Sequence, residues 1–155
     1  MKTLRALSVL LLAWFSILPF LPLAHADDDA IARARSLFDR YVALGAAYDE
    51  AVADLYADSA FIKNTRRSPD GQARSMTMPA LTYKSLIRQV MPQAKQAGDL
   101  STYSEVKFVP DGDRVRIEAT RYSELKKYSS PFLLVVGPAE NGTWLILEEV
   151  GESRP

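Results

Sequence analysis

Residues 104–120, SEVKFVPDGDRVRIEAT, decide the fold class of this 155-residue chain. Apolar and polar side chains alternate on both sides of the turn sequence PDGD at residues 110–113. This alternation predicts an antiparallel hairpin whose two strands each have one buried and one solvated face. The apolar face of the second strand comprises Val115, Ile117 and Ala119, and its polar face comprises Arg114, Arg116, Glu118 and Thr120.

Two more strands are predicted after this hairpin. Residues 132–136 form a continuous apolar run, and residues 143–150 combine apolar side chains with two glutamates. The sequence Glu140-Asn141-Gly142 between them is typical of a hairpin turn. The C-terminal half of the chain is therefore predicted to be a meander of antiparallel strands.

The N-terminal half has helical periodicity instead. Apolar residues recur at spacings of three and four over residues 31–42, 49–56 and 83–91, which predicts three helices. Pro79 suits the start of the third helix and Gly98 its end, while Pro92 is expected to kink or restart it. Between the second and third helices, a short strand is expected to begin at Phe61, and the polar residues 63–74 are expected to form a loop with a turn.

Helices followed by strands predict an α+β fold. We expect three N-terminal helices to pack on one face of a curved antiparallel sheet. Such a curved sheet can leave a cavity between the two layers, and ligand pockets are commonly found in that position.

Composition excludes several classes of function. The sequence has 19 Lys and Arg residues against 19 Asp and Glu residues, so the usual electrostatic basis for nucleic-acid binding is absent. It contains no cysteine, which excludes disulfides, thiolate nucleophiles and zinc–cysteine sites.

The first 26 residues predict a secretory signal peptide. A basic start is followed by an apolar run from Ala6 to Leu23 and by Ala24-His25-Ala26, a typical cleavage sequence. Cleavage after Ala26 would leave one domain, residues 27–155, in the periplasm or outside the cell, with no membrane attachment. An uncleaved anchor is the alternative, because about 18 apolar residues can just span a bilayer.

Cleavage would also remove His25, the one histidine of the sequence. A chain without His or Cys has no imidazole base, thiol nucleophile or imidazole metal site. We therefore expect no metal and no cofactor, and any chemistry must use carboxylates, amines, amides or hydroxyls.

Three segments resemble the nuclear transport factor 2-like superfamily, which includes ketosteroid isomerases and polyketide-cyclase-like proteins. They are RYVAL at residues 40–44, residues 49–61 ending in YADSAF, and NGTWLI at residues 141–146. The resemblance covers residues 27–152 and implies a cone-shaped, cystatin-like α+β fold. It identifies no specific member and does not establish an activity, because one fold serves many functions.

The isomerase branch of that superfamily can be compared residue by residue. Its chemistry needs a carboxylate base together with a tyrosine and a protonated acid that stabilise an oxyanion. The resemblance places Tyr41 at the position of the tyrosine and Asn64 at the position of the base. Because an amide cannot remove a proton from carbon at a useful rate, steroid-type isomerisation is not expected.

Other candidate site residues follow from the pattern itself. Arg121 continues the apolar face of its strand, where a charge needs a partner or a pocket mouth. Glu148 and Glu149 are adjacent, so one of them must face the helices in either register. An Arg–Glu pair there would suit a polar or anionic ligand; alternatively, these side chains reach water at strand ends.

Aromatic residues supply further candidates. Tyr41, Tyr56 and Tyr83 lie on the apolar faces of the three predicted helices, where they could line a pocket or belong to the core. Trp144 could face the cavity or close the core. The predicted ligand-binding set is Tyr41, Tyr56, Asn64, Arg121, Trp144 and Glu148.

Two functions remain open at this stage. The first is a non-catalytic secreted or periplasmic domain that binds a small molecule or a protein partner through its cone cavity or sheet face. The second is a small-molecule lyase, isomerase or hydrolase that uses Glu148 or Glu149 with Arg121 and Tyr41. An ionisable group with a displaced pKa inside the cavity is required by the second function. The resemblance also implies pairing through the exposed sheet face, so a homodimer and a monomer both stay open.

Overall fold

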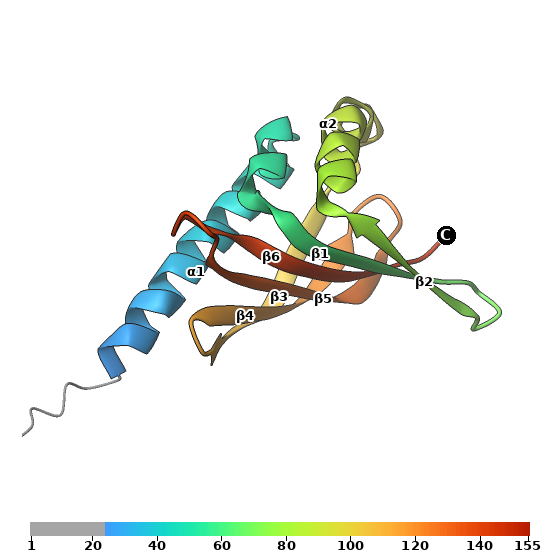
Figure 1. Ribbon diagram of the computed structural model, residues 1–155. Coiled ribbons are helices and arrows are strands. Elements are labelled where there is room, and N and C mark those ends of the chain that lie inside the picture. The colour runs from blue at the N-terminus through green and yellow to red at the C-terminus, as the bar shows by residue number, and fades with distance from the viewer. Residues whose placement is uncertain (1–23) are drawn as a thin grey trace, which may run out of the picture.

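The computed structural model describes residues 24–155, which form two α-helices, one 3-10 helix and a six-stranded sheet (Figure 1). The predicted signal peptide lies outside the described residues as far as Leu23, and its cleavage after Ala26 stays a prediction. In the described residues, neither α-helix has the length and apolar character needed to cross a bilayer. The elements are α1 (Ala24–Ala46), η1 (Glu50–Leu55), β1 (Tyr56–Arg67), β2 (Ala73–Pro79), α2 (Ala80–Ala97), β3 (Ser101–Asp111), β4 (Arg114–Ser123), β5 (Tyr128–Pro138) and β6 (Trp144–Ser153).

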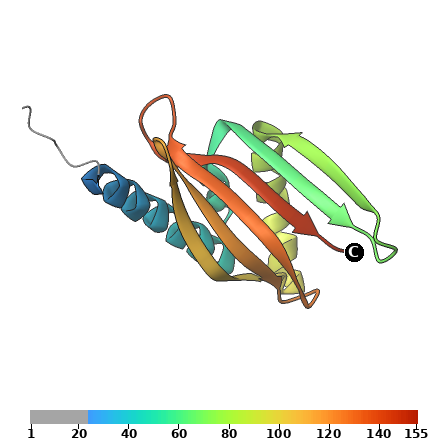
Figure 2. The same cartoon turned by 90° about the horizontal axis from the view of Figure 1, so that it is seen from below.

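The helices cover one face of the curved sheet, which confirms the predicted α+β class (Figures 1 and 2). The strand order is β2-β1-β6-β5-β4-β3. Helix α1 packs over β3 to β6, whereas α2 packs over β1, β2 and η1. We call the helix-covered side of the sheet its inner face.

The sheet is mixed, and the prediction of an antiparallel sheet was wrong in this respect. β1 pairs with β6 in parallel, while the other four pairings are antiparallel. The parallel pair arises because β1 inserts beside the last strand of the chain. A connection through β2, α2 and the β3–β5 meander separates the two strands.

The helical prediction also needs correction. The second predicted helix is a six-residue 3-10 helix, N-capped by Asp49, whose side chain accepts a hydrogen bond from the Ala51 N–H at 2.9 Å. The third follows a β1–β2 hairpin that occupies the predicted loop at residues 63–74. Nearly every residue of β2 is exposed, so this hairpin lacks the apolar alternation that reveals a strand. Helix α2 continues through Pro92 and ends at Gly98, whose φ of 65° is left-handed.

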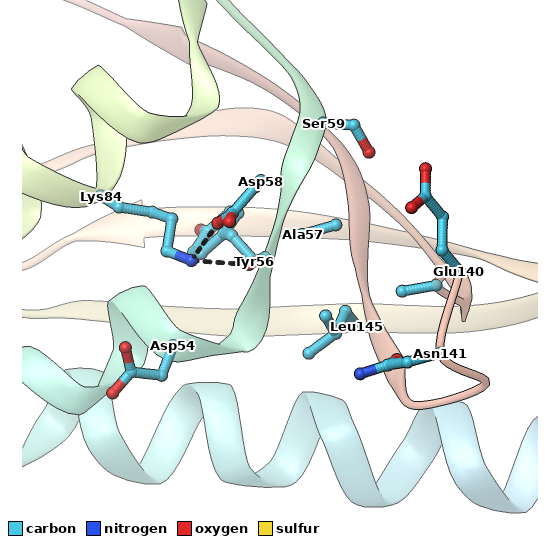
Figure 3. Close-up of a pocket in the computed structure, with 10 residues that line it drawn as sticks. Asp54, Tyr56, Ala57, Asp58, Ser59, Lys84, Glu140, Asn141 and Leu145 are labelled. Carbon is cyan, nitrogen blue, oxygen red and sulfur yellow. Dashed lines mark hydrogen bonds and ion pairs between the residues drawn. The ribbon is translucent and has the colours of Figure 1, made fainter.

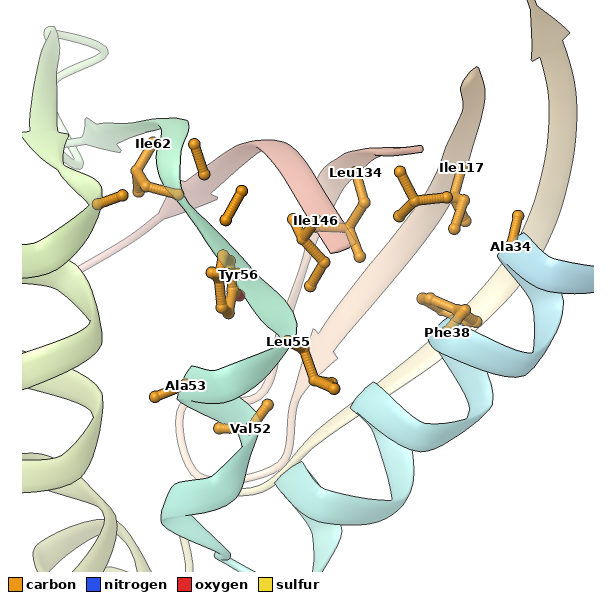
Figure 4. Close-up of a cluster of buried hydrophobic side chains, with 14 of the residues drawn as sticks. Ala34, Phe38, Val52, Ala53, Leu55, Tyr56, Ile62, Ile117, Leu134 and Ile146 are labelled. Carbon is orange, nitrogen blue, oxygen red and sulfur yellow. The ribbon is translucent and has the colours of Figure 1, made fainter. Parts of the chain in front are cut away.

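The apolar core fills one part of the space between sheet and helices (Figure 4). The predicted core face of β4 is confirmed, because Val115 and Ile117 are fully buried. Phe38 of α1 and Leu55 of η1 pack against this part of the sheet from the helical layer. The fully buried aliphatic side chains of the three central antiparallel strands are Val115, Ile117, Leu134, Val136 and Ile146.

A β-bulge in β6 decides which of the two glutamates faces the helices. Ile146 lies opposite Val136, but Glu148 lies opposite Val135, so β6 contains one extra residue at this point. The alternation of side chains is thereby shifted by one. Glu149 joins Ile146 on the inner face, and Glu148 lies on the outer face, contrary to its predicted place in the site.

Candidate functional site

Glu149 lies on the inner face of β6 and is only 8% exposed. The Tyr56 hydroxyl donates a hydrogen bond to its Oε2, and the Tyr83 hydroxyl donates to its Oε1 at 2.8 Å. Tyr56 is the first residue of β1 and Tyr83 lies in the first turn of α2, so the two donors come from different layers. Their rings meet edge to face with centroids 5.4 Å apart, which holds both hydroxyls at the carboxylate.

Burial raises the pKa of Glu149 above its ordinary value of 4.5. Removal from water disfavours the charged carboxylate, whereas the hydrogen bonds from Tyr56 and Tyr83 and the charge of Arg121 favour it. The carboxyl group is therefore easier to protonate than a solvated glutamate. Burial likewise raises the pKa values of Tyr56 and Tyr83.

A second pair of tyrosines lies close to Glu149. The Tyr103 hydroxyl on β3 donates to the Tyr41 hydroxyl on α1 at 3.3 Å. Burial raises the pKa of Tyr41 and raises that of Tyr103 to about 12, and the charge of Glu149 adds to both shifts. Within residues 24–155, the Tyr41 hydroxyl accepts this bond but donates to no protein atom. We call Tyr41, Tyr56, Tyr83, Tyr103 and Glu149 the Tyr–Glu cluster.

An aromatic wall supports the Tyr41 side of the cluster. Phe38 and Phe132 flank Tyr41 in near-parallel arrangements, with ring centroids 6.3 Å and 5.9 Å away. The Tyr103 ring meets the Phe132 ring at 5.1 Å. This wall gives the hydroxyls an apolar surround in which hydrogen bonds are strong.

Four of the six predicted site residues lie along the polar part of the inner face, and two do not. Tyr41 and Tyr56 belong to the cluster, and Arg121 and Asn64 lie further along the inner face. The Asn64 Nδ2 donates to Ser153 Oγ at 2.8 Å, and the Arg121 Nη2 donates to the Glu152 carbonyl at 2.7 Å.

Trp144 and Glu148 do not join this group. Trp144 lies at the start of β6 opposite Pro138, half-buried against the apolar core. Glu148 lies opposite Val135 on the outer face.

The predicted set omitted three cluster residues: Glu149, Tyr83 and Tyr103. Glu149 and Tyr83 were recognised as candidates for the inner side, but nothing in the local pattern ranked them above their neighbours. Tyr103 was missed because a bulge in β3, where Glu105 has a φ of 54°, interrupts the alternation that would have linked it to Phe108. Its pairing opposite Arg121 becomes visible only in the sheet.

A separate pocket of about 440 Å³ opens beside β1 and the β5–β6 turn (Figure 3). Lys84 lines it and donates a hydrogen bond to the Tyr56 carbonyl at 3.2 Å, and it pairs with Asp58 at 2.7 Å. Asp54 on its margin pairs with Arg88 at 2.5 Å. Because these charges already have partners and the Tyr56 hydroxyl points to Glu149 instead, this pocket is separate from the Tyr–Glu cluster.

Within the part of the chain that the structure describes, no three side chains of the metal-binding types gather into a metal site. The ionisable groups of the Tyr–Glu cluster are one carboxyl and four phenols. Such a cluster can donate and accept hydrogen bonds and exchange a proton.

Comparison with known proteins finds similarity in structure but not in sequence. No protein-family model matches the chain, and no curated protein matches it. A nuclear transport factor 2-like protein with a cystatin-like fold from Novosphingobium aromaticivorans superposes with a TM-score of 0.53 at 15% identity, over 80% of this chain and 81% of that one.

Two Shewanella proteins are similar to the same degree. One from Shewanella oneidensis, a nuclear transport factor 2-like protein of unknown function, has a TM-score of 0.54 at 15% identity, over 79% of this chain and 98% of that one. One from Shewanella frigidimarina, provisionally named a ketosteroid isomerase, has a TM-score of 0.55 at 18% identity, over 77% and 94%. At these identities the likeness concerns the fold alone, and the described residues therefore have the nuclear transport factor 2-like, cystatin-like fold that the sequence motifs resemble.

Proposed function

We propose that this protein binds a small, largely apolar organic molecule at the Tyr–Glu cluster. The observation that carries the proposal is the buried carboxyl group of Glu149, held by Tyr56 and Tyr83. Burying an ionisable group costs free energy, and an apolar residue of similar size would serve a purely structural role better. Perturbed carboxyl groups between the layers of a fold are typical of functional sites.

The arrangement around Tyr41 supports a ligand with a hydrogen-bond acceptor. Its hydroxyl proton has no acceptor within residues 24–155, so a ligand carbonyl, ether or phenol oxygen could take it. Phe38 and Phe132 pack against the Tyr41 ring and make its surroundings apolar, which suits a largely apolar ligand.

The test is a fluorescence titration with 2-naphthol, an apolar ring system that carries one hydroxyl. We expect the Tyr41→Phe variant to bind this probe about 3- to 10-fold more weakly, the effect of one neutral hydrogen bond. The matched control is Tyr122→Phe, since Tyr122 lies on the same strand as Arg121 but on the opposite face. Absence of binding to the unmodified protein, or equal losses in both variants, would refute the proposal.

Acid–base catalysis by Glu149 is the second candidate, and the raised pKa of its carboxyl group favours it. A lyase, isomerase or hydrolase would each need such a group. Asn64 argues against steroid-type isomerisation, because it is an amide and its Nδ2 is already bonded to Ser153.

Native mass spectrometry of the protein purified from its own host would separate the two candidates by identifying a co-purified molecule. That molecule would then be incubated in D₂O with the unmodified protein and with Glu149→Gln. Catalysis predicts deuterium uptake or turnover that the variant loses while still binding the molecule. A binding protein would leave the molecule unchanged in both cases.

Export and self-association stay part of the proposal. The sequence of residues 1–26 supports signal-directed export, which N-terminal sequencing of exported material would test.

The outer face of the sheet supports pairing of two copies of the chain, because it combines half-buried apolar residues with an Arg116–Glu118 ion pair at 2.9 Å. Sedimentation of the mature protein would distinguish a dimer from a monomer.

A further inference from the structure

A second pocket lies on the inner face, at the end of the sheet where β4 turns into β5. It has a volume of about 280 Å³ and is bounded by the first residues of β3 and the last residues of β6. We call it the rim pocket. Its charged and hydroxyl side chains include Arg121, Lys126, Arg154, Ser123, Ser153 and Asp99.

The rim pocket carries a surplus of positive charge. Arg121, Lys126 and Arg154 face it, against the single carboxylate of Asp99. None of these three cations has a carboxylate oxygen within 4.0 Å in residues 24–155, although other Arg and Lys residues form six such pairs. Their charge is therefore available to a bound anion.

Internal hydrogen bonds explain only part of the placement of Arg121. Its Nη2 is held by the Glu152 carbonyl, but its Nε is buried without a partner. Ser130 lies directly opposite on β5, is 2% exposed, and its Oγ also has no partner in the described chain. Because both paired residues carry a buried polar atom without a partner in the described chain, this is an unfavourable place for an arginine unless its charge has another role.

The rim pocket and the Tyr–Glu cluster lie on the same inner face of the sheet. Glu149, Gly151 and Ser153 are alternate residues of β6, and four residues of extended strand span about 13 Å. Gly151 presents no side chain, and a methyl group added there would approach nothing closer than Asn64 Oδ1 at 3.8 Å. Arg121 lies beside Tyr103, so it links the pocket to the cluster.

We propose that the rim pocket binds the oxyanion group of an elongated ligand whose apolar end lies at the Tyr–Glu cluster. This inference rests on the proposed function, since it assigns the other end of the same ligand. The natural ligands are then amphipathic organic acids or phosphate esters. Arg121, Lys126 and Arg154 hold the oxyanion, and the ring system runs over Gly151 toward Tyr41.

Charge also decides the direction in which the ligand lies. An anionic group placed beside Glu149 would be repelled whenever that carboxyl group is ionised. At the rim the same group meets three cations instead. The ligand therefore binds with its anionic end outward.

Two probes with the same ring system test this inference. The first is 6-hydroxy-2-naphthoate, which carries a hydroxyl and a carboxylate at opposite ends, and the second is 2-naphthol. We expect the carboxylate to tighten binding to the unmodified protein by about 10-fold or more, as for a charge-assisted hydrogen bond. Raising the salt concentration should reduce this advantage, because Lys126 and Arg154 are exposed.

Substitutions then locate the effect. Arg121→Gln and Lys126→Gln should each reduce the advantage of the carboxylate probe. Lys126→Gln should leave binding of 2-naphthol unchanged, because Lys126 lies outside the Tyr–Glu cluster. Lys126 is exposed, so its variant folds even if Arg121→Gln does not. Lys127→Gln is the control, because Lys127 pairs with Glu124 and does not line the pocket.

The outcomes distinguish this inference from the function on which it rests. If both probes bind the unmodified protein equally, the rim pocket is not an anion site, and binding at the cluster stands. If Lys127→Gln is as harmful as Lys126→Gln, the effect is one of net charge and the site is refuted. If neither probe binds, the proposed function fails, and this inference fails with it.

Discussion

Strands β4, β5 and β6 present two different surfaces to the helices along one face of the sheet. At one end the surface is aliphatic, and its side chains are fully buried: Val115, Ile117, Leu134, Val136 and Ile146. Toward the other end the same strands carry polar groups, from Glu149 through Ser130 to Arg121. The inner face is thus aliphatic at one end and polar at the other, although both sets of side chains point toward the helices.

The two ends also differ in how well their polar atoms are satisfied. Both buried side-chain atoms that lack a hydrogen-bond partner within residues 24–155, Arg121 Nε and Ser130 Oγ, belong to the polar end. The aliphatic end contributes the hydrophobic stabilisation, about 25 cal/mol for each Å² buried. A firmly packed aliphatic end thus allows the polar end to keep buried polar groups that cost stability.

The largest expected effect is in the aliphatic end. Leu134→Ala should lower the free energy of unfolding by about 2–5 kcal/mol, because Leu134 is fully buried and its loss leaves a cavity. Urea denaturation measures this. A loss below about 1 kcal/mol would show that the aliphatic end does not carry the stability of the fold.

The next effect concerns pH and belongs to the polar end. The folded-state pKa of Glu149 lies above its ordinary value of 4.5, so the folded state binds this proton more tightly than the unfolded state. The resulting stabilisation is fully present below pH 4.5 and is lost as the pH rises through the folded-state pKa. One such group changes the free energy of unfolding by at most about 1.4 kcal/mol per pH unit.

Denaturation of the unmodified protein and of Glu149→Gln across the acidic and neutral range measures this contribution. The glutamine does not titrate, so the difference in stability between the two proteins should shift in favour of the variant as the pH rises. A difference that does not change with pH would mean that Glu149 is not buried as described.

A smaller effect is expected from loss of one donor to Glu149. Tyr83→Phe should lower the free energy of unfolding by about 1–2 kcal/mol, because the Oε1 of a buried carboxyl group loses its partner. The pKa of Glu149 should rise further, since that hydrogen bond favours the ionised form. Thermal denaturation with Tyr122→Phe as the outer-face control checks the first effect, and NMR titration of the carboxyl group checks the second.

The smallest effects on stability should come from substitutions at the polar end of the inner face. Ser130→Ala should leave the free energy of unfolding within about 0.5 kcal/mol or raise it slightly, because it removes a buried hydroxyl that has no partner in the described chain. Comparison with Leu134→Ala on the same strand sets the two ends against each other directly. A loss above about 1 kcal/mol in Ser130→Ala would mean that the hydroxyl has a structural partner.

Gly151→Ala should likewise be tolerated, since the new methyl group would make only ordinary contacts. We nevertheless expect weaker binding of 6-hydroxy-2-naphthoate, because the methyl group would lie where we propose that the ring system of the ligand crosses Gly151. Fluorescence titration measures the change. Unaltered affinity would place the ligand elsewhere.

The sequence predicted those parts of the fold in which the spacing of apolar residues matches the side chains that are buried. The face of β4 that holds Val115 and Ile117 was predicted because every second residue is apolar. The β1–β2 hairpin could not be predicted. Strand β2 is exposed on both of its faces, so its sequence shows no alternation of apolar and polar residues. Tyr56 was assigned to a helix for a related reason, because a short 3-10 helix and the end of an α-helix have similar patterns.

Of the candidate site, the sequence predicted Tyr41, Tyr56 and Arg121 but chose Glu148 over Glu149. The choice depends on a single extra residue in β6, and a bulge has no reliable signal in one strand read alone. Tyr103 was hidden by the equivalent irregularity in β3. Both errors concern the register between paired strands. That register depends on the partner strand and cannot be predicted from one strand alone.

The sequence by itself determined the α+β class, the apolar face of β4 and the absence of cysteine chemistry, because these depend on residue type and local period. Only the tertiary structure decided that Glu149 is the buried carboxyl group and that four tyrosines surround it. These five residues come from α1, β1, α2, β3 and β6. Their meeting depends on one parallel strand pairing and on register shifts in the pairings of β1 with β6, β3 with β4 and β5 with β6. These are properties of contacts between distant segments and not of any one segment.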